Sequence, residues 1–134
     1  MSLLVLDTNI VLDLFVFNDA KATKLKAALQ AGAQQWIATQ PMRDELVRVL
    51  DYPHIAGKMA FYKIEADGVL AQFDQLVRLV PAAPKAAITC KDPDDQKFID
   101  LAVEQLAMLL SKDEADKLKL AIEGRRRLER PGAW

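Results

Sequence analysis

The sequence predicts a single α/β domain spanning residues 1–134, in which helices cover both faces of a mostly parallel, doubly wound sheet. Short, continuous apolar runs such as residues 3–6 are typical of strands buried on both faces of a parallel sheet. Segments with the apolar periodicity of helices follow these runs, and alternating strands and helices fold into three layers. The length of 134 residues also favours one domain with one core.

Composition and charge narrow the class of protein. The chain is 51% hydrophobic and 28% charged, with a formal net charge of −1, which is typical of soluble globular proteins. No apolar run approaches the roughly 20 residues that cross a bilayer, and the first residues lack a basic region and a cleavage site. We therefore expect a cytoplasmic protein without a membrane partner. A nucleic-acid partner would need local positive patches and metal ions.

The chain has one cysteine, Cys90, and one histidine, His54, so neither an internal disulfide nor a His/Cys zinc site can form. A bound metal would need oxygen ligands, which favours magnesium or manganese over zinc. We interpret His54 as a surface residue at a helix start rather than a general base. Cys90 is interpreted as a small, half-buried residue rather than a nucleophile.

The first apolar strand, residues 3–6, leads directly into Asp7. Ligands of open α/β sheets bind at the carboxyl ends of the strands, where this aspartate falls. Thr8 and Asn9 are residues able to cap the helix that continues to residue 14. Asp7 is therefore placed for chemistry, with helix capping as the alternative role.

The middle of the chain continues the alternation of helix and strand. Residues 20–31 predict a helix ended by Gly32, and residues 35–38 predict a second strand. Apolar residues spaced three and four apart predict a long helix or a helical hairpin over residues 55–76. A third strand is expected at residues 76–80.

A third helix, with Pro41 in its first turn, follows the second strand. Its apolar stripe consists of Met42, Leu46, Val49 and Leu50. Glu45 therefore lies beside the buried face, near the strand end, as Asp7 does. The alternative is a solvated glutamate next to Arg48.

Asp92, Asp94 and Asp95 put three carboxylates in four positions, immediately before a helix whose apolar face includes Phe98 and Ala102. Helix capping and the helix dipole explain one or two acids at such a place. Like charges packed together raise the energy unless a cation intervenes, and a divalent metal ion is the simplest one.

Residues 108–110 form another apolar strand, and the polar corner that follows repeats the pattern of the first strand. Asp113 ends this corner, which also contains Ser111 and Lys112, and Asp116 follows one turn later. A final helix is expected to end at about residue 123, and a short edge strand is expected at residues 125–128. Charged residues there either block unwanted pairing or contact phosphates, and they are Arg125, Arg126 and Arg127.

Carboxylates at strand ends and helix starts would meet at one edge of such a sheet. Asp7 and Asp113 end strands there, and Glu45 and Asp95 open helices from it. These carboxylates would repel one another in an empty site, and they would bind one or two magnesium or manganese ions. Two such ions about 4 Å apart activate a water and stabilise the leaving oxygen in phosphodiester cleavage.

The segments LVLDTNIVLD, DELVRVL, DPDDQKFIDLA and LLSKDEAD occur in the order and at about the spacing seen in PIN-domain ribonucleases. The chain resembles this family over nearly its whole length, and is most similar to the branch described as toxin components of toxin–antitoxin systems. The resemblance implies a sheet of about five parallel strands. It also implies cleavage of single-stranded RNA with magnesium or manganese, a homodimer, and an antitoxin partner that inserts residues into the acidic crevice.

The resemblance carries over to individual residues. It implies that the catalytic, metal-binding acids are Asp7, Glu45, Asp95 and Asp113. Asp92 competes with Asp95 as the third acid, and Asn9 is expected to orient Asp7. Ser111 and Asp116 are the expected accessory residues. Lys112 stands where relatives often have glycine, so it either occupies the rim of the site or contacts a phosphate.

Two alternatives of other classes stay open. The first is a non-catalytic module that keeps the fold and binds a metal ion, RNA or a partner protein. The second is a phosphotransfer domain of the haloacid-dehalogenase or receiver type. The haloacid-dehalogenase type needs a second aspartate where Asn9 stands, and the receiver pattern of acids is not found.

Overall fold

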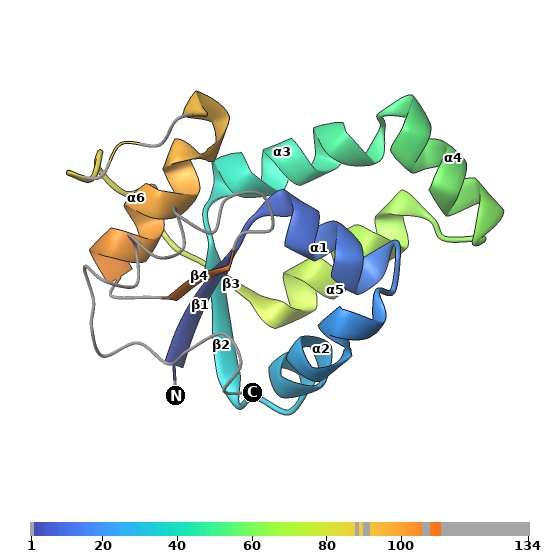
Figure 1. Cartoon of the computed structure of the whole chain (residues 1–134), viewed down its shortest axis with the longest axis horizontal. Helices are drawn as coiled ribbons and strands as arrows, with labels where there is room; N and C mark the ends of the chain where they lie inside the picture. The colour runs from blue at the N-terminus through green and yellow to red at the C-terminus, as the bar shows by residue number, and fades with distance from the viewer. Residues whose placement is uncertain (1, 88, 90–91, 106–107, 111–134) are drawn as a thin grey trace.

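The structure is a computed structural model, and it describes residues 2–87, 89, 92–105 and 108–110 (Figure 1). The described strands form one four-stranded sheet in the order β3-β2-β1-β4, and every neighbouring pair is parallel. The strands are β1 (Ser2–Leu6), β2 (Gln34–Ala38), β3 (Val77–Leu79) and β4 (Met108–Leu110). The parallel sheet predicted from the apolar runs is therefore confirmed.

Helices lie on both sides of this sheet, as predicted for a doubly wound fold. Figure 1 shows α6 on one side and α1, α2 and α5 on the other. The described helices are α1 (Thr8–Phe15), α2 (Thr23–Gln30), α3 (Gln40–Leu50), α4 (Pro53–Phe61), α5 (Ala66–Leu76) and α6 (Gln96–Gln105), with short 3-10 turns η1 (Ala20–Ala22) and η2 (Pro93–Asp95).

Two helix predictions need refinement. The helix expected over residues 20–31 begins as the 3-10 turn η1, and Gly32 follows it with a left-handed φ of 76°, a conformation that glycine adopts without strain. The apolar periodicity over residues 55–76 belongs to two helices, α4 and α5. The chain between them includes Lys63, whose φ of 56° cannot continue a right-handed helix. The single long helix is therefore wrong, and two separate helices take its place.

The core is centred on the sheet. Leu4 and Val5 in β1 are completely buried, because β1 lies between two strands and is covered on both faces. Trp36 in β2 is 1% exposed and packs between two aromatic rings. Its ring centroid lies 6.1 Å from that of Phe15 in α1 and 5.0 Å from that of Phe73 in α5, the latter edge-on. These contacts fix two helices against the same face of the sheet.

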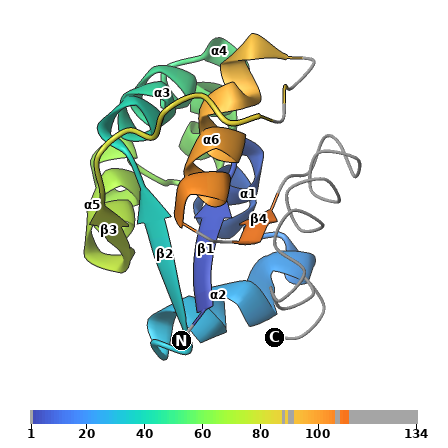
Figure 2. The same ribbon diagram turned by 90° about the vertical axis from the view of Figure 1, so that its left-hand side faces the viewer.

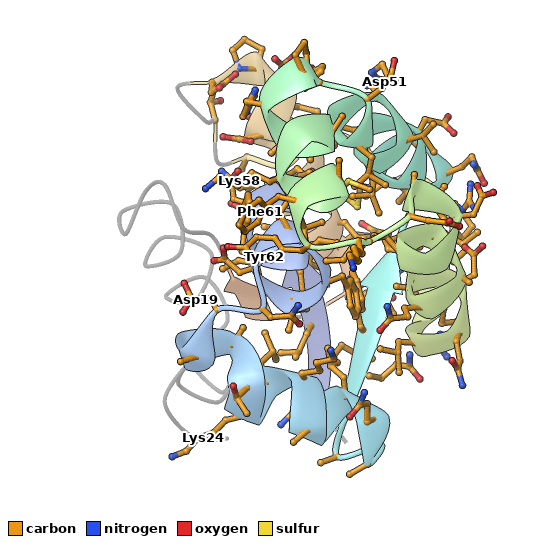
Figure 3. All side chains as sticks on the ribbon, turned by 90° about the vertical axis from the view of Figure 1, so that its right-hand side faces the viewer. Asp19, Lys24, Asp51, Lys58, Phe61 and Tyr62 are labelled. Atoms are coloured by element: carbon orange, nitrogen blue, oxygen red, sulfur yellow. The ribbon has the colours of Figure 1, made fainter. Side chains whose placement is uncertain are left out.

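The last residue of α4 and the residue that follows it present aromatic side chains to solvent. Phe61 is 81% exposed and Tyr62 is 51% exposed, and their rings meet edge to face. Figure 3 shows both side chains close to Lys58 on the outer side of α4. Of the described helices, none combines the length and the apolar character needed to span a bilayer.

An ion pair joins α3 to α5. The Arg43 guanidinium donates two hydrogen bonds of 2.8 Å to the Asp74 carboxylate, and they lower the pKa of Asp74 below its ordinary value of 3.8. Stability from a lowered pKa is fully present above the ordinary value and disappears as the pH falls through the folded-state value.

We expect Asp74→Asn to lower the free energy of unfolding by less than about 1 kcal/mol at neutral pH, because the Asp74 side chain is 49% exposed. Urea unfolding of both proteins at neutral and at strongly acidic pH measures this. The difference should vanish at acidic pH, and a difference that persists there would contradict the assignment.

Several predictions fall on residues outside the described ranges. They are the placement of Cys90, the strand end at Ser111, Lys112, Asp113 and Asp116, the last helix, and the fifth, edge strand with Arg125, Arg126 and Arg127. These stay predictions.

Candidate active site

Asp7 occupies the corner between β1 and α1. Its backbone is extended, with ψ of 167°, so the strand ends here and the helix starts at Thr8. One oxygen of its carboxylate, Oδ1, accepts a hydrogen bond of 3.0 Å from the Ile10 N–H, which makes Asp7 the N-cap. The residue is only 4% exposed. The predicted capping by Thr8 and Asn9 is therefore wrong, since both lie in the first turn of α1.

The position of Asp7 suits an anionic side chain. The first N–H groups of α1 have no acceptor within the helix itself, and the N-terminus carries the positive end of the helix dipole. Burial removes the water that would hydrate the carboxylate, and these N–H groups compensate for that loss. Capping thus explains why an aspartate is stable at this corner, and it is compatible with a ligand at the same strand end.

Glu45 lies in α3 and points toward the same corner. Its side chain is 18% exposed, and its two oxygens accept from different elements. Oε2 accepts a hydrogen bond from the Thr8 hydroxyl, and Oε1 accepts one of 2.7 Å from the Lys97 ammonium. The alternative of a solvated glutamate beside Arg48 therefore does not apply. Thr8 directly follows Asp7, so its hydrogen bond links Glu45 to the corner that Asp7 occupies.

The three aspartates of the acidic cluster before α6 differ in exposure and in hydrogen bonding. Asp92 is the N-cap of η2, and its side chain accepts from the Asp94 N–H at 2.9 Å. Asp92 and Asp94 are exposed, whereas Asp95 is half-buried at the end of η2. Local capping therefore accounts for Asp92. Lys97 also donates to the Asp94 carbonyl oxygen, which ties this segment to Glu45.

Thr8 and Lys97 connect three of the four segments that carry the predicted acids. The hydrogen-bonded path runs from Thr8 to Glu45, then to Lys97 and to the Asp94 carbonyl. Figure 2 shows β1 and β2 pointing toward α3 and the start of α6. The corner of Asp7, Glu45 and the segment of Asp95 are thus joined at the carboxyl edge of the sheet, while Asp113 lies outside the described residues.

The chemistry of this edge fits a hard divalent cation. Its acidic side chains are carboxylates, and carboxylate oxygens are the ligands that Mg²⁺ and Mn²⁺ prefer. A cationic group, the Lys97 ammonium, already lies against Glu45. Within the described ranges, no three carboxylate, histidine or cysteine side chains are close enough to hold one metal ion together. The four-acid cage stays a prediction.

Sequence reasoning missed three polar residues at or near this edge, namely Thr8 as a partner of Glu45, Lys97 and Asp100. Lys97 is 52 residues away from Glu45 in the chain, so no local pattern indicates their contact. Asp100 is 8% exposed and accepts from the Ala86 N–H at 2.9 Å and from the Gln96 side chain at 2.7 Å. The spacing of four between Gln96 and Asp100 is a signal that could have identified the second contact.

We expect Asp100→Ala to lower the free energy of unfolding by about 1–3 kcal/mol, because the Ala86 N–H loses the acceptor that holds its loop against α6. Asp100→Asn keeps one carbonyl oxygen and should cost less. Urea unfolding of both variants measures the difference. Equal stability of Asp100→Ala and the natural protein would show that this contact contributes nothing.

The fold and the site together define an α/β protein with carboxylates at the carboxyl edge of a parallel sheet. A family model described as PIN domain matches residues 3–115, which include Asp7, Glu45, Asp95 and Asp113. The chain therefore belongs to the PIN-domain family, and the resemblance seen in its motifs is confirmed. PIN domains are generally nucleases and usually bind divalent metal ions. No curated protein and no solved structure matches the chain.

Proposed function

We propose that this protein is a magnesium- or manganese-dependent endoribonuclease that hydrolyses phosphodiester bonds of single-stranded RNA. The observation that supports this most is the linkage of Thr8, Glu45 and Lys97, which joins three acid-bearing segments at one edge of the sheet. Membership of a family of nucleases supports the same reaction class.

In this proposal, one or two ions are held by carboxylates. The ligands are Asp7, Glu45, Asp95 and Asp113. When bound, the metal would supply activation of the attacking water and stabilisation of the leaving oxygen. Asp95 is favoured over Asp92 as third ligand, because Asp92 is exposed and its carboxylate caps η2.

The remaining residues of the proposed site support this chemistry. Asn9, in the first turn of α1, would orient Asp7. The accessory residues Ser111 and Asp116 would support Asp113. Positive side chains would hold the phosphates of the RNA, and the candidates are Lys112, Arg125, Arg126 and Arg127.

A cleavage assay tests the reaction class directly. We expect an unstructured RNA oligonucleotide to be cut internally in Mn²⁺ or Mg²⁺, and to stay intact when EDTA is present. The same sequence as a duplex, or as DNA, reports on the preference for single-stranded RNA. Cleavage that continues in EDTA would contradict metal dependence.

The second candidate is a binding module that keeps the same fold and site without turnover. The Lys97 ammonium already occupies one oxygen of Glu45, and this observation favours it. Calorimetry with Mn²⁺ combined with the cleavage assay separates the two candidates. A binding module would release heat on metal addition and yield no RNA products.

A role as the toxin of a toxin–antitoxin pair, a homodimer and a cytoplasmic location are further parts of the proposal. Static light scattering should give twice the chain mass of 14.9 kDa if the homodimer forms. Growth arrest on expression, relieved by a co-expressed partner, is the result expected of a toxin. A monomeric mass would contradict the homodimer, and unaffected growth would contradict the role as a toxin.

A further inference from the structure

The Lys97 ammonium lies where the proposed metal site needs a positive charge. It is 2.7 Å from Oε1 of Glu45, and the two side chains are 26% and 18% exposed. The same ammonium donates to the Asp94 carbonyl and lies 4.9 Å from the centre of the Phe98 ring. Lys97 therefore has one anionic partner on α3, one further partner in η2 and one on its own helix.

We propose that Lys97 is an internal counter-ion of the active site, which a divalent cation displaces from Glu45 when it binds. This proposal rests on the proposed function of the site. In the metal-free protein, the ammonium neutralises a carboxylate that is largely removed from water. Lys97 is a positioning residue here, since it acts through Glu45.

Electrostatics makes the two cations competitors. An ammonium and a divalent ion on the same carboxylate would repel each other strongly in a partly desolvated site. The lysine side chain can move away, because its charge sits on a flexible four-carbon stem. The Asp94 carbonyl and the face of Phe98 are polar and aromatic partners that the ammonium can keep after it leaves Glu45.

Competition predicts the direction of a mutational effect. Lys97→Met removes the charge and keeps most of the stem, so the metal no longer has to displace a cation. We expect the dissociation constant of Mn²⁺ to fall about fivefold, measured by calorimetry on protein stripped with EDTA. The melting temperature in EDTA should fall, because Glu45 loses its partner, and added Mn²⁺ should raise it by more than in the natural protein.

Two further variants make the test specific to the charge. Lys97→Arg retains a cation and should bind Mn²⁺ about as the natural protein does. Lys97→Gln is neutral and can still donate to the Asp94 carbonyl, so it should show the same tightening if Lys97→Met folds poorly. Lys58→Met makes the same change of charge on the exposed side of α4, at the opposite end of the molecule from α6, and should leave Mn²⁺ affinity unchanged (Figures 1 and 3).

The outcomes separate this proposal from the proposed function. If the natural protein binds Mn²⁺ and the neutral variants bind it equally or more weakly, Lys97 is not a competing counter-ion and the inference is overturned. If the natural protein binds no Mn²⁺ at all, the metal-dependent function fails and the inference fails with it. Tighter binding by both neutral variants, and by neither Lys97→Arg nor Lys58→Met, supports it.

Discussion

Asp7→Asn should reduce manganese-dependent RNA cleavage by about 100-fold or more while the protein stays folded. Asparagine is as good an N-cap as aspartate, and its amide oxygen can accept the Ile10 N–H that Oδ1 of Asp7 accepts. The helix start is therefore preserved. The negative charge at the end of β1 is lost, and with it the affinity of this corner for a divalent cation.

Cleavage rates on an unstructured RNA, measured together with the melting temperature, test this expectation. Asp74→Asn is the matched control, because it makes the same chemical change at an exposed carboxylate on α5. The control should cut RNA at the natural rate. Undiminished cleavage by Asp7→Asn would remove Asp7 from the catalytic machinery and with it the proposed mechanism.

Trp36→Ala should have the largest effect on stability, lowering the free energy of unfolding by about 3–5 kcal/mol. Trp36 is 1% exposed and touches both Phe15 and Phe73, so truncation leaves a cavity between β2, α1 and α5. A loss of this size is a large share of the roughly 5–15 kcal/mol that stabilises a typical domain. Urea unfolding followed by circular dichroism measures it.

Phe61→Ala is the comparison for this substitution, since it also removes an aromatic ring, but one that is 81% exposed. Its cost should stay within about 0.5 kcal/mol, as is usual for surface positions. Similar losses for Trp36→Ala and Phe61→Ala would mean that the burial of Trp36 between the two rings does not decide its contribution.

Elements marked by a pattern within their own segment of the chain were predicted well. The continuous apolar run before Asp7 identified β1 because a central parallel strand is buried on both faces. The break between α4 and α5 was harder, because the apolar spacing continues through it and no proline or glycine marks it. Lys63 instead takes a left-handed conformation at that turn. The N-cap was misassigned because Asp7, Thr8 and Asn9 are all good capping residues.

The candidate site was predictable only in outline. The helical stripe of α3 placed Glu45 beside the buried face, and the structure agrees. Its partners Thr8 and Lys97 are 37 and 52 residues away along the chain, so their contacts depend on how the helices dock on the sheet. A charge pattern on one helix cannot report such contacts. Lys97 is consequently the functional candidate that required coordinates.

The central claim is that Asp7 and Glu45 help to hold one divalent cation at the carboxyl edge of the sheet. Anomalous scattering from a crystal soaked in Mn²⁺ tests it most directly. The claim predicts a manganese peak in contact with the carboxylates of both residues, with the Lys97 ammonium away from Glu45. A peak elsewhere on the protein, or an empty edge with Lys97 still paired to Glu45 at saturating Mn²⁺, would contradict it.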